Sequence, residues 1–339
     1  MSDTIYDDYP HPVPLIAYLR YKENWLWHFM DKDNQVYGMA HFSYEPLFNR
    51  ARMSCNIDVK GTVYKYSNEI PFPENFAYAH EIGDGKLKIL FKEPQKKFEL
   101  HLTSDDLDLE IYYEAGGPMF DFVACEKVNP DRPHVFSLMN LNTHQMSPVH
   151  QQQILTMTGK IQVKNQQAIV LSGCGNRDHS QGVRCDTITR THSWSWLLFT
   201  NSYFSATDIT VINSPSVLAA DGYMHDRTGL RALKEIDVQL SGATLADGMP
   251  ETVRFLFEDI AGNRFTIVAS IVNRLGVVPL SGEKPDGGMA EYICVENFCQ
   301  LTLEETGETG YGMVQLGYNP AHLSSIQQGY APELNSDKR

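Results

Sequence analysis

The sequence lacks the motifs that would assign a metal, a nucleotide or a covalent mechanism. It contains no HExxH or CxxC pair, no Gly-rich phosphate loop leading into a helix, and no GxSxG nucleophile elbow. The 6 cysteines are scattered, which is typical of reduced thiols in a large domain. We therefore expect no metal and no cofactor.

Basic charge and long apolar runs are also scarce. Lys and Arg number 28 against 42 Asp and Glu, a net charge of −14, and no basic stripe suits a nucleic-acid partner. No apolar stretch approaches the roughly 20 residues of a membrane helix, and the N-terminus has no secretory signal pattern. We expect a cytoplasmic protein without nucleic-acid binding or membrane insertion. The oligomeric state stays open, a homodimer included.

What the chain does have is an apolar–polar alternation with a period of two. Lys86–Phe91, Lys97–Leu102 and Leu107–Tyr112 alternate and are separated by short turn-forming segments, which predicts half-buried antiparallel strands. The same pattern recurs at Val253–Phe257 and Phe265–Val268. Because helical periodicity is scarce, we expect an all-β protein whose sheets close and thereby remove their edges.

The length of 339 residues favours two domains. A single barrel of this length would be unusually large, so we predict two antiparallel β-barrels packed side by side. The polar Asn201–Ser202 region is the predicted boundary, with a first domain over 1–200 and a second over 201–330. Residues 331–339 are predicted to form a tail.

Residues 173–196 hold the densest run of potential chemistry in the chain. An acid, an imidazole, guanidiniums and two Trp suit acid/base work on an apolar or aromatic molecule. Asp178 and His179 follow the Ala168–Leu171 strand, and loops at strand ends often carry function on a rigid scaffold. Two interpretations stand: Asp178 is an acid or base with His179 as its partner, or both side chains satisfy a turn.

Nearby residues allow two interpretations as well. Arg184 and Asp186 alternate on one strand face, so they could form an ion pair or line a site. Trp194 and Trp196 stand at i and i+2, hence on one strand face, where they either wall an apolar site or fill a barrel. Trp25 has the same spacing relative to its aromatic neighbours, and the same two interpretations apply.

One stretch is specific enough to suggest a family. Residues 173–182 read GCGNRDHSQG, which matches the pattern Gly-x-Gly-x-x-Asp-His-x-Trp-Gly except that Gln181 replaces the Trp. His150–Gln153 and the glycines around Tyr311 add weaker matches within residues 20–318. On these motifs the chain resembles the carotenoid hydratase family, also called hydroxyneurosporene synthase-like, which includes the lipocalin-like Diels–Alderases.

The resemblance implies two lipocalin-like β-barrels with a deep apolar pocket near their interface. It also implies cofactor-independent chemistry on terpenoid, polyketide or similarly hydrophobic molecules. Asp178 and His179 align with the family's Asp-His pair, and Glu296 falls in its closing strands, where Glu is common at the position of Gln315. Because Gln181 and Gln315 replace the family's usual Trp and Glu, the resemblance implies a site whose shape differs from that of other members.

We therefore expect a cofactor-independent lyase, hydratase or isomerase acting on a hydrophobic small molecule, with Asp178 and His179 as its catalytic residues. A non-catalytic carrier of a hydrophobic ligand is the alternative, because barrels often serve as containers. A metal-dependent enzyme comes third, since residues 178–192 offer ligand types without regular spacing. The expected substrate-binding residues are Arg184, Tyr112, Trp194, Trp196, Trp25 and Glu296.

Overall fold

The computed structural model is almost entirely β within the residues that it describes. These are residues 8–13, 21–122, 149–183, 191–199, 207–214, 219–227, 229–241, 250–283 and 289–318. A short 3-10 helix, Pro46–Phe48, interrupts the strands. In this described part, no helix has the length and apolar character needed to span a membrane.

The chain divides into two compact units. The first comprises residues 1–121 and 143–184, and the second comprises residues 122–142 and 185–339. Each unit is built on its own antiparallel sheet, and each sheet encloses its own hydrophobic cluster.

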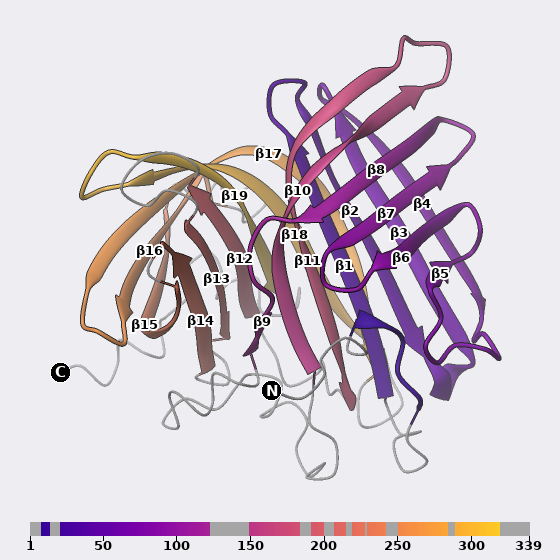
Figure 1. The fold of residues 1–339 in the computed structure, drawn as a ribbon, viewed down its shortest axis with the longest axis horizontal. Coiled ribbons are helices and arrows are strands. Elements are labelled where there is room, and N and C mark those ends of the chain that lie inside the picture. The colour runs from indigo at the N-terminus through magenta and orange to yellow at the C-terminus, as the bar shows by residue number, and fades with distance from the viewer. Residues whose placement is uncertain are drawn as a thin grey trace. The chain divides into compact units, whose positions relative to one another are not determined.

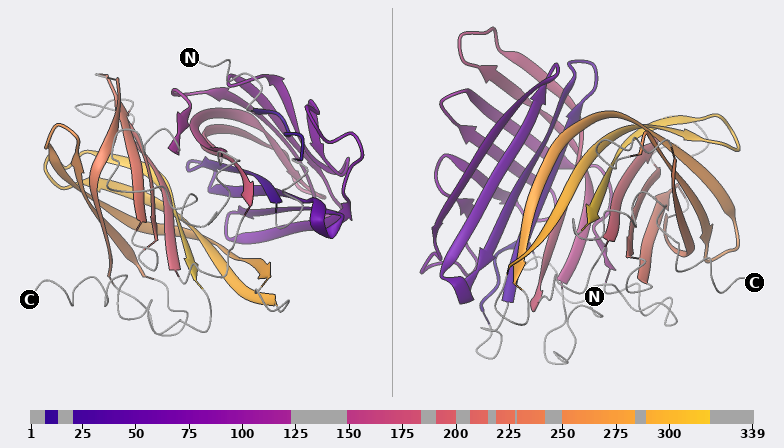
Figure 2. Two further views of the ribbon diagram at one scale, coloured as in Figure 1. Left: turned by 90° about the horizontal axis from the view of Figure 1, so that it is seen from below. Right: turned by 180° about the vertical axis from the view of Figure 1, so that it is seen from behind.

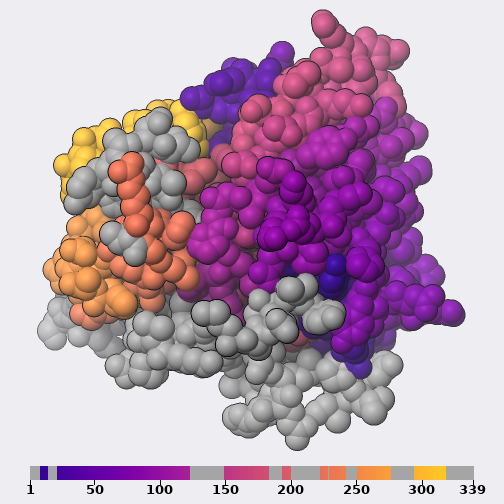
Figure 3. All heavy atoms as spheres, in the orientation of Figure 1, coloured from indigo at the N-terminus to yellow at the C-terminus, as the bar shows by residue number. Residues whose placement is uncertain are grey.

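The first unit is an 11-stranded sheet that curls into an incomplete ring (Figures 1 and 2). In the space-filling view, the purple atoms of strands β6 to β8 cover the side of this unit that is turned toward the viewer (Figure 3). In spatial order the strands are β4 (Thr62–Pro71), β3 (Arg50–Val59), β2 (Val36–Glu45), β1 (Tyr21–Asp31), β11 (Ile169–Val183), β10 (Val149–Val163), β8 (Leu107–Ala115), β7 (Lys97–Thr103), β6 (Leu87–Glu93) and β5 (Glu81–Gly83), with β9 (Phe120–Asp121) paired to β10.

The predicted period-two segments do form this sheet. In β8 the side chains of Leu107, Leu109, Ile111 and Tyr113 are buried and alternate with more exposed residues. The buried set packs with Trp27 and its neighbours in one cluster on the concave side. This concave side is called the inner face below, and the opposite side the outer face.

The Gly-x-Gly of the family-like stretch has a direct structural reason. A Cβ atom at Gly173 would lie 2.0 Å from the Met30 carbonyl oxygen, and one at Gly175 would lie 2.2 Å from that of His28. Strands β1 and β11 therefore approach so closely here that a side chain would collide with backbone. Glycine at both positions lets β11 seat against β1.

The second unit is a closed barrel of eight consecutive strands. Apolar side chains such as Leu197, Phe255 and Leu301 form the cluster inside it. The strands are β12 (Thr191–Phe199), β13 (Thr207–Ser214), β14 (Ala219–Asp226), β15 (Gly229–Ser241), β16 (Thr252–Asp259), β17 (Arg264–Glu283), β18 (Met289–Leu303) and β19 (Thr309–Tyr318). Strand β12, which lies before the predicted boundary at Asn201–Ser202, pairs with β13 and β19 in this barrel. The all-β prediction with two lipocalin-like antiparallel barrels is confirmed.

Candidate functional site

Strand β11 carries the residues on which the sequence prediction rests. It runs from Ile169 to Val183, so Asp178 and His179 lie within a strand and not in a loop after it. His179 is in register with Trp25, which belongs to the hydrophobic cluster on the inner face. Successive strand residues alternate in direction, so His179 faces inward and Asp178 outward. The predicted partnership between Asp178 and His179 was therefore wrong.

Asp178 instead pairs with side chains of the neighbouring strand β10. Its Oδ2 atom lies 2.6 Å from His150 Nε2 and accepts a hydrogen bond from Gln152 Nε2 at 2.8 Å. Gln152 is the direct register partner of Asp178, and His150 is the diagonal neighbour. The side chains of His150 and Asp178 are 2% and 12% exposed, so this acid–imidazole pair is largely removed from water.

Two amides beside this pair have polar atoms without partners. Asn176 is fully buried, and neither its Nδ2 nor its Oδ1 has a hydrogen-bond partner in the part of the chain described. The same holds for Gln152 Oε1. An unsatisfied buried polar group costs roughly 1–3 kcal/mol, which makes such groups suited to a bound molecule. His150, Gln152, Asn176 and Asp178 are called the Asp178 site below.

On the inner face, His179 belongs to a different cluster, centred on Glu23. The Glu23 carboxylate lies 2.6 Å from His11 Nδ1 and 2.9 Å from His179 Nε2, and it accepts a hydrogen bond from the Tyr21 hydroxyl at 3.1 Å. Burial alone would raise the pKa of Glu23, but the hydrogen bonds from both imidazoles outweigh burial and lower it. His11, Tyr21, Glu23 and His179 are called the inner cluster.

Burial, together with the charge of Glu23, raises the pKa of Tyr21, so its hydroxyl remains a donor. That hydroxyl also donates to Gln181 Oε1 at 2.8 Å. Gln181, which stands where the family pattern has Trp, is thus tied to the inner cluster through Tyr21.

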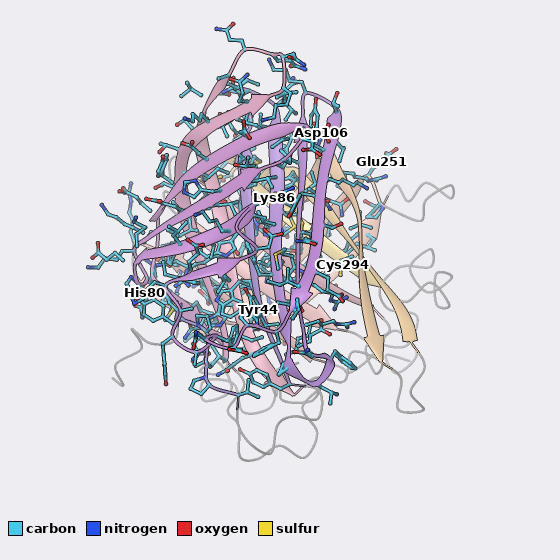
Figure 4. All side chains as sticks on the ribbon, turned by 90° about the vertical axis from the view of Figure 1, so that its right-hand side faces the viewer. Tyr44, His80, Lys86, Asp106, Glu251 and Cys294 are labelled. Atoms are coloured by element: carbon cyan, nitrogen blue, oxygen red, sulfur yellow. The ribbon has the colours of Figure 1, made fainter. Side chains whose placement is uncertain are left out.

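Aromatic rings enclose His179. Its ring stacks on Trp25 at 4.6 Å between centroids with an interplanar angle of 13°. The His11 ring also stacks on His179, at 5.5 Å between centroids. Trp25 in turn contacts Tyr44 edge-on at 5.7 Å. Tyr44 and His80 lie at one end of the first unit, with Asp106 toward the other (Figure 4). Trp25, one of the predicted substrate-binding residues, is thus fully buried against His179.

The N-terminal segment, residues 8–13, is anchored to the inner face by buried charge. Asp8 Oδ1 lies 2.7 Å from Arg177 Nη1, and both side chains are at most 2% exposed. Arg177 also donates to Gln153 Oε1 at 2.9 Å and lies over the ring of Phe98. Tyr9 packs edge-on against His80 at 4.8 Å. Residues 8–11 therefore belong to the structure of the first unit.

A metal ion is the alternative occupant of the inner cluster. His11, Glu23 and His179 form the one group of donors in the described residues whose ligand atoms lie within 4.8 Å of each other, and two imidazoles with a carboxylate suit zinc. Glu23, however, is already saturated by protein donors, including the His11 backbone N–H at 3.1 Å. His179 Nδ1 has no described partner, whereas the second nitrogen of a metal-bound His is normally held. The donor pattern favours a hydrogen-bonded cluster.

In the second unit, the predicted residues Trp194 and Glu296 lie together with Gln315. Gln315 Nε2 donates to Glu296 Oε1 at 2.6 Å across β18 and β19. Trp194 is in register with Gln315, so Trp194, Gln315 and Glu296 share a face of the barrel wall. Their strand neighbours Val314 and Val295 belong to the interior cluster, so this shared face is the outer one.

Tyr112 was expected to bind substrate, but it lies on the outer face of β8, is 43% exposed and contacts Glu110. It is in register with Thr158, six residues along β10 from Gln152, or roughly 20 Å from the Asp178 site. A role for Tyr112 at this site was therefore wrong. Arg184 lies outside the described residues.

Sequence reasoning assigned no role to several site residues. His150 and Gln152 are two apart in a strand, a signal that could have placed them on one face. Glu23 and His11 gave no such signal, because their contact with His179 depends on which strands become neighbours. Register between β1 and β11 spans more than 150 residues of sequence and is not encoded locally.

Solved structures share this fold at low sequence identity. The AttH-type protein of Nitrosomonas europaea aligns with a TM-score of 0.62 at 10% identity, over 88% of this chain and 92% of that one. Kievitone hydratase from Nectria haematococca aligns at 0.54 and 10%, over 88% of each chain. CghA aligns at 0.60 and 12%, over 93% and 96%. The protein thus shares the fold of these three structures, and the lipocalin-like architecture that its sequence resemblance implied is confirmed.

The chain belongs to the family described as Domain of unknown function (DUF7064), whose family model matches residues 4–320. No curated protein matches it in sequence. The family description states no activity, so the function has to be argued from the Asp178 site.

Proposed function

We propose that the protein is a cofactor-independent lyase, hydratase or isomerase that transfers a proton to and from a hydrophobic small molecule. The observation that carries this proposal is the buried Asp178–His150 pair, with 2.6 Å between Oδ2 and Nε2. Pairs of this kind are the usual means of general acid–base catalysis. The fold shared with kievitone hydratase supports the same class of reaction.

The hydrogen bonds at Asp178 indicate which member of the Asp178–His150 pair acts as the base. Two side chains donate to the same carboxylate oxygen, which stabilises its negative charge and makes Asp178 the base. His150 carries the proton that the pair exchanges with substrate. In a hydration, one proton leaves the pair for an alkene carbon and the oxygen of water bonds to the neighbouring carbon. A proton of that water then returns to the pair, and the reverse sequence is a dehydration.

The partnerless amides set the substrate class. Asn176 offers one donor and one acceptor, and Gln152 offers an acceptor, beside the proton-transfer pair. They suit a hydroxyl or carbonyl group on an otherwise apolar molecule. His179 acts from the opposite face as a positioning residue, because its bond to Glu23 fixes β11 against β1.

The test is turnover of a panel of hydroxylated hydrophobic alkenes in water labelled with oxygen-18, read by mass spectrometry. Asp178→Asn and His150→Gln should each lower turnover by about 10²-fold or more, the usual scale for such groups. Thr156→Ala, on the same face of β10 but exposed, is the matched control and should keep full activity. A folded Asp178→Asn protein with most of its activity would refute the assignment.

A non-catalytic carrier is the second outcome of that test. A carrier would bind members of the panel with equal affinity in the wild type and in Asp178→Asn, and neither protein would incorporate the label.

A further inference from the structure

The sheet of the first unit ends in a long strand that has a single neighbour. β4 is one terminal strand of the 11-stranded sheet and pairs with β3 alone, over all 10 of its residues. β5, the other terminal strand, has only 3 residues. An unpaired strand edge is a template for pairing with another chain, so proteins normally keep such edges short or covered. The edge of β4 is neither.

The turn between β3 and β4 determines which backbone groups face this edge. Val59 and Thr62 flank a two-residue turn with positive φ at both positions, the type I′ conformation, so they form a hydrogen-bonded pair. Such pairs alternate along two antiparallel strands. The Phe72 N–H, which donates to the Asn49 carbonyl oxygen at 3.1 Å, continues the same even-numbered series. The backbone groups of the odd-numbered residues within Val63–Glu69 therefore point away from β3.

These outward-facing groups are available to a partner strand. The Glu69 N–H donates to Oδ1 of the exposed Asn68 at 2.9 Å, a local bond that a partner's carbonyl can replace. The backbone groups of Val63, Lys65 and Ser67 have no partner in the part of the chain that the structure describes, and these residues are exposed. Side chains between them pack against the hydrophobic cluster of the inner face, namely Tyr64, Tyr66 and Ile70. The strand is therefore held in its extended shape before any partner arrives.

The charges on β4 fit a second copy of the same strand. A two-fold axis at Ser67 pairs the strands antiparallel and places Lys65 opposite Glu69 of the partner subunit, twice by symmetry. Opposite charges that face each other across strands stabilise the pair, and like charges destabilise it. Glu69 is already in register with Arg52 of its own chain, so its carboxylate would lie between two cations. We propose that the protein forms a homodimer through antiparallel pairing of two β4 strands about Ser67.

Sedimentation velocity of the full chain tests the proposal. The wild type should sediment as a dimer. Ser67→Pro removes an N–H at the axis and leaves the bonds to β3 intact, so this variant should be monomeric. Lys65→Glu turns both attractive contacts into repulsive ones and should raise the dissociation constant of the dimer by about tenfold or more. Lys160→Glu, the same charge change at an exposed position on β10, is the matched control and should sediment as the wild type does.

Disulfide formation tests the register and does not depend on how the proline variant folds. The two copies of residue 67 would face each other with their Cα atoms about 5.5 Å apart, so Ser67→Cys should link the subunits on mild oxidation. The two copies of residue 63 would lie roughly 27 Å apart, so Val63→Cys should link them no more than the wild type does.

Two results would overturn the proposal. One is a wild type that is monomeric at about 0.1 mM, which would leave the edge of β4 to a strand of another protein. The other is a dimer that persists in a folded Ser67→Pro protein, or that Val63→Cys links as readily as Ser67→Cys, because the subunits would then meet elsewhere. Asp178→Asn should remain dimeric, so failure of either proposal leaves the other intact.

Discussion

Glu23→Gln is the perturbation with the largest effect on stability that we expect in the inner cluster. The carboxylate is fully buried and holds His11, Tyr21 and His179 through short hydrogen bonds. Glutamine has nearly the same shape, keeps one acceptor oxygen and loses the charge. The substitution therefore tests the charge of Glu23 and not its volume.

The expected loss follows from these contacts. Hydrogen bonds to a charged group are worth about 1.5–3 kcal/mol each, and breaking a buried charged pair costs about 3–5 kcal/mol. Because glutamine still accepts one of the bonds, we expect a loss of about 3 kcal/mol in the free energy of unfolding of the first unit. With a urea dependence of about 2 kcal/mol per molar, the midpoint falls by roughly 1.5 M.

The pH dependence of the free energy of unfolding provides a second test of the charge of Glu23. The pKa of Glu23 is lower in the folded protein than its ordinary value of about 4.3. Its contribution is therefore fully present above that ordinary value and is lost as the pH falls through the folded value. The wild type should therefore lose stability as the pH falls below the ordinary pKa of about 4.3, and Glu23→Gln should lose less.

Urea unfolding followed by hydrogen exchange and mass spectrometry provides the assay, because peptides from β1 and β11 report on the first unit alone. Glu304→Gln is the control, since Glu304 pairs with Arg254 on the surface of the second barrel, where an ion pair adds little. A Glu23→Gln protein whose stability stays within about 0.5 kcal/mol of the wild type would falsify the view that this charge holds the inner cluster.

Further expectations concern other parts of the chain. Arg177→Met leaves Asp8 buried without its cation, so urea unfolding should show a loss of about 3–5 kcal/mol. Burial raises the pKa of the Cys55 and Cys299 thiols, so iodoacetamide at pH 8 should modify them in urea but not in the native protein, as mass spectrometry will show. Tyr112→Phe should leave turnover unchanged, since Tyr112 is far from the Asp178 site. Dialysis against a chelator should likewise leave turnover unchanged, and zinc bound with micromolar or better affinity at the inner cluster would contradict the hydrogen-bonded arrangement.

The fold could be predicted because its signal is local. Alternation over 6 to 10 residues reports burial of one strand face, and it identified β6, β7, β8, β16 and the start of β17. It failed where strands are polar on both faces. In β10 and β11 the runs HQQQ and GNRDHS are buried on both faces and paired with each other, so their polarity concealed these parts of the two strands.

The candidate site could be predicted only in part. Strand alternation alone separates Asp178 from His179, and the same rule applied to His150 and Gln152 would have placed them on one face. The partners of His179 could not be found, because Glu23 meets it through a pairing of β1 with β11 that the sequence pattern does not specify. The substitution at Gln181 was noticed in the sequence, but its tie to Tyr21 required the structure.

The Asp-His dipeptide of β11 has a consequence for how this protein can change over evolution. Adjacent residues serve opposite faces, so the loss or gain of one residue earlier in the strand would exchange them. The gain of one residue would bring Asp178 to the position of His179, next to Glu23, whereas the loss of one residue would put the imidazole in the place of the acid beside His150. Point substitutions can tune either face independently, but insertions and deletions cannot be tolerated between Gly173 and Gly182. The length of this segment should therefore be invariant among functional relatives even where its individual residues differ.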